Sequence, residues 1–330
     1  MKRIALFLLV VMMMVGMMGC SQSAGSETQP EVTQAPQEQT AEIVEPEVEE
    51  TVEESSTIAL TDANGREVVF EELPQRVVSL YASFTDLWLE AGGSLVGTVD
   101  GSTLPESANE IPKLGKGTPN VEDLLTYEPD FVLLSAGRSA HQELADVLEQ
   151  SGIRFMFIDY NNFDEMMDTY ESFCRLNDRL DLFETKGREM ETKITSIMDG
   201  QKDQSFTYLL LFATSKSVTT KDDNIASEII NAMGGKNIAE DGAVANEESK
   251  QFSMEKILEL DPDYVFVQTM GSVEKAEARL EADVISNPAW QGLTAVQEER
   301  YLYLPKELFL YKPNMKYPDA YEYVANLTNH

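Results

Sequence analysis

The chain carries the stretch NVEDLLTYEPDFVLL at residues 120–134 and a second version of it, SMEKILELDPDYVFV, at residues 253–267. Each version predicts a short capped helix, a turn with an acidic residue before Pro-Asp, and a buried strand. Asn120 and Ser253 are favourable N-cap residues, and the proline ends each helix because its ring cannot continue it. The apolar run that closes each version has the length and composition of an interior parallel strand. Two equivalent units predict two similar lobes with a cleft between them.

The rest of the sequence alternates strands and helices on both sides of one long helical stretch. Asn64-Gly65 predicts a hairpin turn between strands at 58–60 and 68–70. Further strands are expected at 76–80, 95–99, 155–158, 208–212 and 301–304, and helices at 85–90, 140–150, 226–233, 273–284 and from Lys316. This alternation predicts a parallel, doubly wound sheet in each half.

The helical stretch runs from Asp164 to about Met198, with apolar residues mostly three, four or seven positions apart. Gly187 inside it costs roughly 1 kcal/mol relative to alanine, so a kink or two shorter helices is an alternative to a single helix. The predicted fold is α/β, with two doubly wound lobes over residues 57–163 and 201–330. A long α-helix over 164–200 joins them, and the ligand cleft lies between them.

The N-terminus has the pattern of a targeting segment. Lys2 and Arg3 precede an apolar run of 15 residues, Ile4–Met18, and Gly19-Cys20 follows it. This length is short for a membrane span and typical of a signal peptide, and the Gly-Cys pair resembles a bacterial lipoprotein signal. We expect a signal peptide over residues 1–19 and a bacterial, extracytoplasmic protein that is anchored to the cell membrane through lipidated Cys20. An uncleaved anchor helix is the alternative.

Residues 20–56 are expected to form an acidic, disordered tether, because residues 27–54 hold ten Glu and no Lys or Arg, and residues 21–56 hold no aromatic residue. Residues 57–330 hold 48 acidic and 23 basic residues, a net charge near −25, which argues against a nucleic-acid partner. Besides Cys20 the chain has only Cys174, which we expect to be a packed thiol, and the only histidines are His141 and His330. We expect no disulfide framework, no zinc site, no enzyme activity and no cofactor.

Several short motifs, taken in order, resemble a known family: the lipid-anchored substrate-binding proteins of ABC importers for iron-siderophores, haem and cobalamin. They are Arg76-Val77-Val78-Ser79-Leu80, Ser83-Phe84-Thr85-Asp86, Pro112-Lys113-Leu114-Gly115, both versions of the repeat, Gly234-Gly235-Lys236-Asn237-Ile238 and Tyr311-Lys312-Pro313-Asn314. The resemblance covers about residues 58–328. It implies two α/β lobes bridged by one long helix, in a monomer that captures a small-molecule ferric chelate and delivers it to an ABC permease. A haem or cobalamin receptor of the same type, and a surface adhesin, are the alternatives.

In that family a glutamate on each lobe docks into arginines of the permease dimer. On this chain the repeat assigns these positions to Glu122 and Glu255. The alternative is that each acid only complements the dipole of its own helix, an effect of about 0.3–1 kcal/mol.

Ligands of open α/β sheets bind outside the carboxyl ends of the strands. The loops expected there hold cations and aromatic rings, which suit an anionic ferric siderophore with aryl groups: Tyr81, Lys116, Arg138, Lys216, Lys221, Lys250 and Tyr311. The chelate would hold the iron, so no direct metal ligand is expected, and a solvated surface position is the alternative for each residue. Met270 is expected at the ligand site as an apolar contact; in the haem alternative it would be an iron ligand, with Thr118 where relatives carry another.

Overall fold

The computed structural model describes residues 57–101, 103–117, 119–241 and 253–328, which belong to one compact unit, Glu54–His330. The expected signal peptide, Cys20 and the tether lie outside the described residues, as do Thr118 and Lys250. None of the helices in the described ranges combines the length and the apolar character that a bilayer crossing requires.

Both versions of the repeat fold as the sequence predicts. The first forms helix α2 (Val121–Leu125) and strand β5 (Phe131–Ser135), and the second forms helix α8 (Met254–Leu260) and strand β10 (Tyr264–Thr269). The Asn120 side chain accepts a hydrogen bond from the backbone N–H of Glu122 at 3.0 Å. The Ser253 hydroxyl accepts one from Lys256 N–H at 3.3 Å. Each helix therefore begins at a side-chain cap.

The Pro-Asp pair of the repeat has a structural role in both lobes. The residue before the proline is left-handed in each version, with φ of 46° at Glu128 and 37° at Asp261. The aspartate after the proline then accepts hydrogen bonds from the start of a neighbouring strand. Asp130 accepts from the N–H of Gln75 at 2.8 Å and of Arg76 at 3.0 Å. Asp263 accepts from Thr207 N–H at 2.7 Å.

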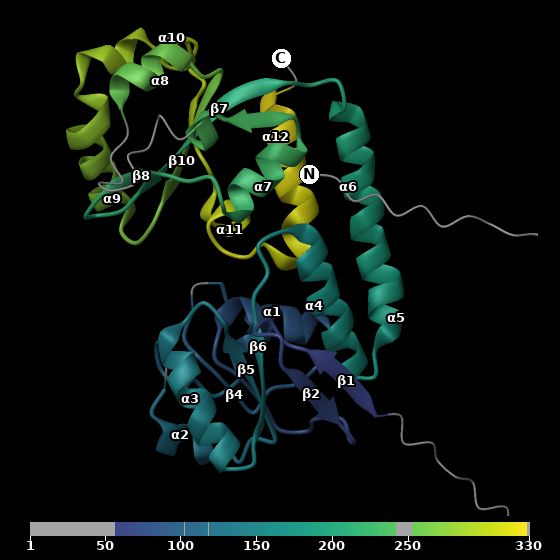
Figure 1. The fold of residues 1–330 in the computed structure, drawn as a ribbon. Coiled ribbons are helices and arrows are strands. Elements are labelled where there is room, and N and C mark those ends of the chain that lie inside the picture. Colours follow the sequence, from purple (N-terminus) through teal and green to yellow (C-terminus); the bar gives the residue numbers. More distant parts are fainter. Residues whose placement is uncertain (1–56, 102, 118, 242–252, 329–330) are drawn as a thin grey trace, which may run out of the picture. The chain divides into compact units, whose positions relative to one another are not determined.

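The N-terminal lobe contains a four-stranded parallel sheet in the order β4-β3-β5-β6 (Figure 1). Its other strands are β3 (Val77–Ser79), β4 (Gly97–Thr98) and β6 (Arg154–Ile158), and its helices include α1 (Ala82–Glu90) and α3 (Ser139–Gln150). The expected hairpin is a separate antiparallel pair, β1 (Ile58–Thr61) and β2 (Glu67–Phe70). Alternate residues of β5 are buried in two different clusters, so helices cover both faces of this sheet.

The C-terminal lobe contains a five-stranded sheet in the order β11-β10-β7-β8, with β9 paired to the start of β7. Its strands are β7 (Phe206–Ala213), β8 (Val218–Thr220), β9 (Gly235–Asn237), β10 and β11 (Tyr301–Tyr303). Its helices are α7 (Ile225–Ala232), α8, α9 (Val273–Leu280), α10 (Thr294–Gln297), α11 (Lys306–Phe309) and α12 (Tyr317–Thr328). Among the described strands of this sheet, only β8 runs antiparallel to its neighbour.

Short 3₁₀ and π segments complete the secondary structure. The 3₁₀ segments are Glu106–Ala108, Ile238–Asp241, Pro288–Gly292 and Asn314–Lys316, and the π segments are Phe183–Gly187 and Glu281–Ile285.

The long helical stretch over 164–200 is divided into two segments, which is the alternative of two shorter helices, and the second segment is a helix of 22 residues. Helix α4 (Phe163–Leu176) ends where Asp178 adopts a φ of 53°. A second helical segment then runs for 22 residues, from α5 (Leu180–Leu182) through the π turn to α6 (Arg188–Gln201). The break does not fall at Gly187, where an added Cβ would come within 3.1 Å of the Met167 side chain. That glycine lets the two segments pack closely.

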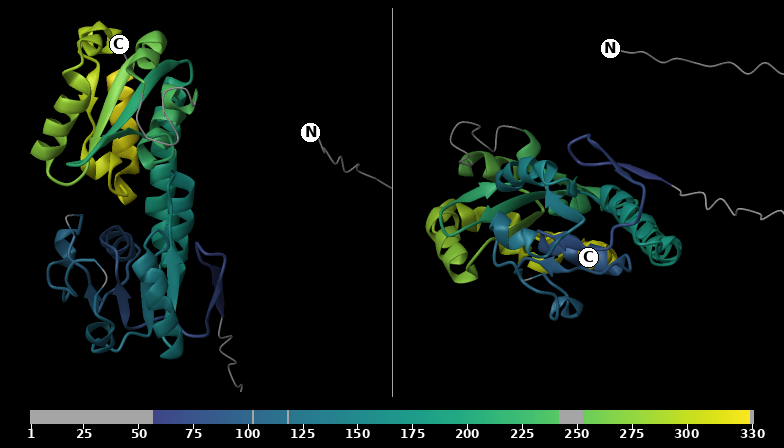
Figure 2. Two further views of the ribbon diagram at one scale, coloured as in Figure 1. Left: turned by 60° about the vertical axis from the view of Figure 1, so that its left-hand side comes forward. Right: turned by 90° about the horizontal axis from the view of Figure 1, so that it is seen from below.

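The two segments have different neighbours. Helix α4 packs against α1 of the N-terminal lobe, whereas α6 packs against α12 of the C-terminal lobe. Figure 1 and the further views of Figure 2 show the 22-residue segment running beside both lobes. One cluster of buried residues includes Phe84 and Tyr160 from the first lobe and Phe309 and Tyr317 from the second, so the core continues through the junction. Cys174 is buried in it, as expected, and burial raises the pKa of its thiol to about 11.

Candidate ligand-binding cleft

The first wall of the candidate site lies where the strand order of the N-terminal sheet reverses. The chain passes from β3 to β4 on one side and then to β5 on the other side of β3, and this switch point is where open α/β sheets bind ligands. Tyr81 follows β3 and Arg138 follows β5. The Arg138 guanidinium carbon lies 5.0 Å from the centre of the Tyr81 ring, which is within the range of a cation–π contact.

Buried polar side chains hold the two loops of this wall. The Tyr81 carbonyl accepts hydrogen bonds from Ser79 Oγ at 3.1 Å and Thr85 Oγ1 at 3.3 Å. The Ser135 N–H, at the end of β5, donates to His141 Nδ1 at 2.8 Å. Burial, with the nearby charge of Arg138, lowers the pKa of His141 to about 4. The imidazole is therefore neutral at physiological pH and acts as an acceptor that fixes the start of the Arg138 loop.

The second wall lies at the equivalent switch point of the C-terminal sheet, between β7 and β10. Phe212 and Gln268 are directly paired across these strands. Gln268 is buried, and its Oε1 accepts from Asn224 Nδ2 at 2.8 Å while its Nε2 donates to the Phe309 carbonyl at 2.6 Å. These bonds satisfy the hydrogen-bonding groups of the Gln268 amide. They also hold Asn224 and Gln268 in place as the polar floor of the cleft on the side of the second lobe.

Lys221 belongs to the same wall. Its ammonium lies 5.7 Å from the centre of the Phe212 ring. Its backbone carbonyl accepts a hydrogen bond from Asn237 Nδ2 at 2.6 Å, and Asn237 is fully buried. The asparagine of the Gly-Gly-Lys-Asn motif therefore positions the loop that carries Lys221.

The two walls line one cavity of about 390 Å³. The first lobe contributes Tyr81, Ser135, Gly137, Arg138, Asp159 and Asn161, and the second contributes Phe212, Lys221, Asn224, Ile225, Gln268, Phe309, Leu310 and Lys312. A neighbouring cavity of about 160 Å³ shares Tyr81 and Arg138 and adds Tyr311. Within the described ranges, no carboxylate lies within 4.0 Å of the Arg138 or Lys221 charge, whereas Asp159 pairs with Lys312 at 3.1 Å.

The structure brings together some of the residues that the sequence predicts and leaves others outside. Tyr81, Arg138, Lys221 and Tyr311 line the cavities. Lys116, Lys216 and Met270 are exposed and are absent from the cavity linings in the described part of the chain. Lys250 lies outside the described residues. Sequence reasoning did not select Phe212, Gln268 or Lys312, although the first two end buried strands and the third lies in a family motif.

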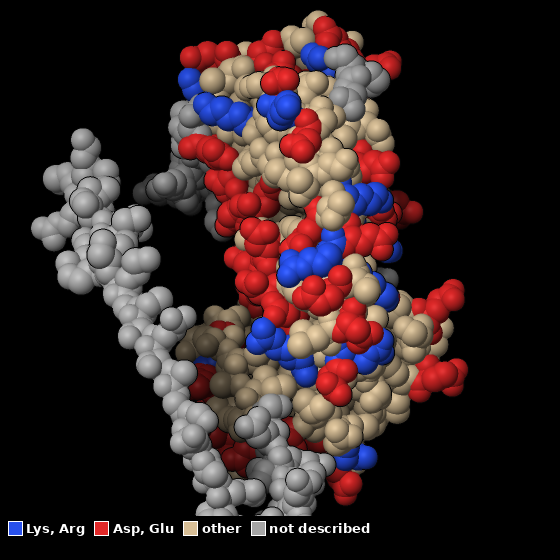
Figure 3. All heavy atoms as spheres, turned by 90° about the vertical axis from the view of Figure 1, so that its right-hand side faces the viewer, with Lys and Arg blue, Asp and Glu red and all other residues tan. Residues whose placement is uncertain are grey.

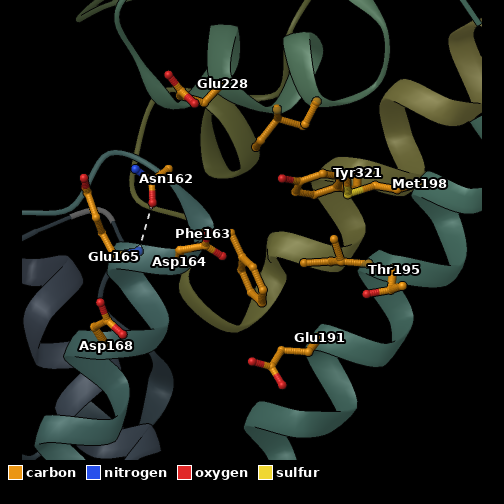
Figure 4. Close-up of a pocket in the computed structure, with 13 residues that line it drawn as sticks. Asn162, Phe163, Asp164, Glu165, Asp168, Glu191, Thr195, Met198, Glu228 and Tyr321 are labelled. Carbon is orange, nitrogen blue, oxygen red and sulfur yellow. Dashed lines mark hydrogen bonds between the residues drawn. The ribbon is translucent and has the colours of Figure 1, made fainter. Parts of the chain in front are cut away.

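A larger cavity of about 750 Å³ lies away from both switch points (Figure 4). It is the space between helices α4, α6, α7 and α12, where the connecting segment passes between the lobes. Its lining includes five carboxylates: Asp164, Glu165, Asp168, Glu191 and Glu228. Figure 3 shows that Asp and Glu cover more of the face on this side of the molecule than Lys and Arg do, with other residue types between them. Such a lining repels an anionic ligand, so size alone does not identify the site.

The remaining candidate residues lie on the helices of the repeat. Glu122 and Glu255 are both exposed in the first turns of α2 and α8. In Figure 1 these two helices lie on the side of the molecule away from α5 and α6. Within the described residues, no three His, Cys, Asp or Glu side chains are arranged to hold a metal ion.

The structure thus has two α/β lobes with a cavity between their switch points, and Arg138 and Lys221 line this cavity. Such an arrangement is typical of proteins that bind a small ligand between two lobes. A family profile described as periplasmic binding protein matches residues 77–308. The chain belongs to this family.

The curated relatives include an uncharacterized ABC transporter substrate-binding lipoprotein, YvrC of Bacillus subtilis. It is 25% identical over 254 residues, which are 74% of this chain and 76% of that protein. The vitamin B12-binding protein of Vibrio cholerae is 24% identical over 256 residues, 76% of this chain and 88% of that protein. The family to which the chain belongs is one of binding proteins rather than enzymes.

Solved structures share the fold. Staphylococcus aureus SirA complexed with staphyloferrin B has a TM-score of 0.63 at 18% identity, covering 82% of this chain and 97% of that one. S. aureus IsdE complexed with heme has a TM-score of 0.62 at 18% identity, covering 77% and 99%. Relatives with the same two lobes thus bind different ligands, so the ligand of this chain depends on its own cleft.

Proposed function

We propose that this protein captures a ferric siderophore or a similar anionic ferric chelate in the cleft and delivers it to the permease of its importer. The observation that carries the proposal is the pair of cation–aromatic contacts, Arg138 with Tyr81 on one lobe and Lys221 with Phe212 on the other. Both pairs line the same cavity. Cations without a carboxylate partner favour an anion, and the rings offer flat apolar contact to aryl or chelate-ring atoms.

Haem and cobalamin receptors of the same importer type are the alternatives. The haem alternative gave Met270 the role of iron ligand, yet its side chain is 55% exposed and does not line the cleft cavities among the described residues. The polar Asn224–Gln268 floor and the two cations suit oxygen-rich anions better than the apolar faces of a porphyrin. These features favour the chelate.

Calorimetric titration of the full chain separates the ligands. The panel is a ferric tris-catecholate, a ferric tris-hydroxamate, ferric citrate, haem and cyanocobalamin. We expect at least one ferric chelate to bind more tightly than haem and cyanocobalamin. Tight haem binding with a Soret band, and no heat with the chelates, would instead support the haem receptor.

Variants then test which residues bind the chelate. Charge-assisted hydrogen bonds contribute about 1.5–3 kcal/mol, so Arg138→Gln or Lys221→Gln should raise the Kd roughly 10- to 150-fold. Lys216→Gln is the matched control, because Lys216 is an exposed lysine outside the cavity lining. Equal effects of all three substitutions would show that the response comes from net charge rather than from the cleft.

We also propose that Glu122 and Glu255 dock onto the permease. Exposed ion pairs contribute only about 0.2–1 kcal/mol each, and rim charges act mainly on the association rate. Glu122→Ala with Glu255→Ala should therefore slow capture by the purified permease, most strongly at low salt. The control pair is Glu149→Ala with Glu277→Ala, two exposed acids on α3 and α9. Unchanged capture of the Glu122→Ala/Glu255→Ala variant, or an equal slowing in the control pair, would refute the assignment.

A further inference from the structure

A three-residue segment of the second lobe lies beside the cleft and is hydrogen-bonded to the first lobe. It consists of Lys312, Pro313 and Asn314, between α11 and α12, and we call it the strap. Pro313 and Asn314 are buried. All the hydrogen-bond partners given below for Lys312 and Asn314 belong to the first lobe.

Asn314 makes three hydrogen bonds with its side-chain amide. Its Nδ2 donates to the Ser83 carbonyl at 2.8 Å and to Asp86 Oδ2 at 2.7 Å. Its Oδ1 accepts from the Tyr160 hydroxyl at 2.6 Å. Asn314 is 1% exposed and Tyr160 is fully buried. Separating the lobes here would break three bonds together, and a buried polar group left without a partner costs about 1–3 kcal/mol.

The backbone of Asn314 indicates why this position holds asparagine. Its φ is 52°, in the left-handed region that glycine adopts at least cost. Asparagine tolerates this region better than most residues and supplies the amide that glycine lacks. The bonds to the first lobe are therefore made by a side chain on a constrained backbone.

Lys312 provides a second connection. Its ammonium pairs with Asp159 at 3.1 Å, donates to the Tyr160 carbonyl, and lies 4.3 Å from the centre of the Tyr160 ring. The Lys312 side chain is only 11% exposed, whereas that of Asp159 is 42% exposed, so solvent still screens part of this ion pair.

The strap is also part of the cleft wall. Lys312 lines the cavity that contains Arg138 and Lys221, and it also lines a second cavity of about 460 Å³ beside α1 with Ser83 and Asp86. On the second-lobe side, the Phe309 carbonyl three residues earlier accepts from Gln268. The strap is thus bonded to the first lobe through Lys312 and Asn314, and it begins three residues after Phe309, which is bonded to Gln268 at the switch point of the second lobe.

We propose that the strap sets the separation of the cleft walls before any ligand binds, and that Asn314 and Lys312 are positioning residues for ligand capture. The part on wall separation does not depend on the identity of the ligand. The part on capture rests on the proposed function.

Pulsed EPR tests the separation directly. Spin labels are placed at Glu143→Cys on α3 and Glu277→Cys on α9, both exposed positions, in the full chain with Cys20→Ser and Cys174→Ala. Asn314→Gly keeps the left-handed backbone and removes the amide, so we expect a broader distance distribution. Tyr160→Phe removes one bond and should give a smaller broadening. Glu299→Gly is the matched control, because Glu299 is also left-handed, with φ of 57°, but lies between α10 and β11.

Three outcomes decide the proposal. The proposal is overturned if Asn314→Gly has the same spin-label distance distribution as the unmodified chain and an unchanged circular dichroism spectrum. Equal broadening in Glu299→Gly overturns it as well, because the effect would then not be specific to the strap. Broadening in Asn314→Gly and Tyr160→Phe alone supports the separation.

Titration with the ferric tris-catecholate, ferric tris-hydroxamate and ferric citrate tests the role in capture. We expect the Kd of whichever probe binds the unmodified chain to rise about tenfold in Asn314→Gly, mainly through slower association. An unchanged Kd in a variant with broadened distances would overturn the positioning role. If none of the probes binds the unmodified chain, the proposed function fails, and the distances alone still decide whether the strap sets the separation.

Discussion

His141 is expected to titrate near pH 4, far below an ordinary histidine. The imidazole is fully buried behind the Arg138 loop, and its Nδ1 accepts from Ser135 N–H at 2.8 Å, so the single proton is on Nε2. Within the described residues Nε2 has no hydrogen-bond partner. Protonation would place a buried charge beside Arg138 and would convert the acceptor into a donor that faces the Ser135 N–H. Both effects disfavour the imidazolium, which agrees with the pKa of about 4.

The sign of the effect on stability follows from linkage. Because the folded pKa is lower than the unfolded value of 6.5, the unfolded state takes up more protons as the pH falls. The contribution of His141 is therefore retained above pH 6.5 and is lost progressively toward pH 4. With these two values the linkage relation gives a loss of about 2 kcal/mol at pH 5 and about 3 kcal/mol at pH 4.

Two measurements test this reasoning. The chain has only two histidines, so ¹H–¹³C NMR resolves both imidazole titrations, and the variant His330→Ala assigns them. Urea unfolding at pH 7.5 and pH 5 then compares the unmodified chain with His141→Asn, whose Oδ1 occupies the place of Nδ1. The variant should lose part of its stability at pH 7.5 but should show about 2 kcal/mol less pH dependence. An imidazole that titrates between pH 6 and 7, or an unchanged pH dependence, would refute the argument.

Two further predictions concern stability. Burial raises the pKa of the Asp86 carboxyl, and the Asn314 hydrogen bond and Lys316 only partly oppose this. The contribution of Asp86 to stability is therefore present at low pH and is lost as the pH rises through the folded pKa. In urea unfolding, Asp86→Asn should thus gain stability relative to the unmodified chain between pH 4 and pH 7. The left-handed residues before the two repeat prolines should respond oppositely to glycine. Glu128→Gly relieves backbone strain and should stabilise the chain by up to about 1 kcal/mol, whereas Asp261→Gly also removes hydrogen bonds from Thr294 N–H and Oγ1 at 2.9 and 2.6 Å and should destabilise it by about 1–2 kcal/mol. Thermal unfolding measures both, and a shift of the same sign in the two variants would contradict this account.

The sequence alone was sufficient for most of the fold. Caps, prolines and apolar periodicity act over a few residues, so the helices and strands of both repeat units could be predicted from local chemistry. The division of the long helical stretch could not be located in this way. The sequence suggests Gly187 as the place of the break, but Gly187 lies within a continuous helical segment and packs closely against Met167. The chain instead turns at Asp178, where the backbone is left-handed. Asn and Asp tolerate this conformation better than most residues, so Asn177-Asp178 is the local signal for the break.

The candidate site was predictable only in part. Tyr81 and Arg138 were expected because strand ends identify the loops that meet at a switch point, and the cavity lining includes both. Lys116 and Lys216 follow strands as well, but their side chains lie outside that lining. A sequence shows which loops gather at one edge of a sheet, but the direction of each side chain depends on packing. For the same reason Phe212 and Gln268 were not selected.

Local sequence therefore determined that this chain forms two matched α/β units with an acid in the first turn of each repeat helix. Tertiary structure decided which cations share a cavity and which segment joins the two units. The physical reason is the distance along the chain over which each kind of interaction acts. Caps and turns depend on neighbours within a few positions, whereas the bonds of Asn314 join it to Ser83 and Tyr160, which are 231 and 154 positions away along the chain.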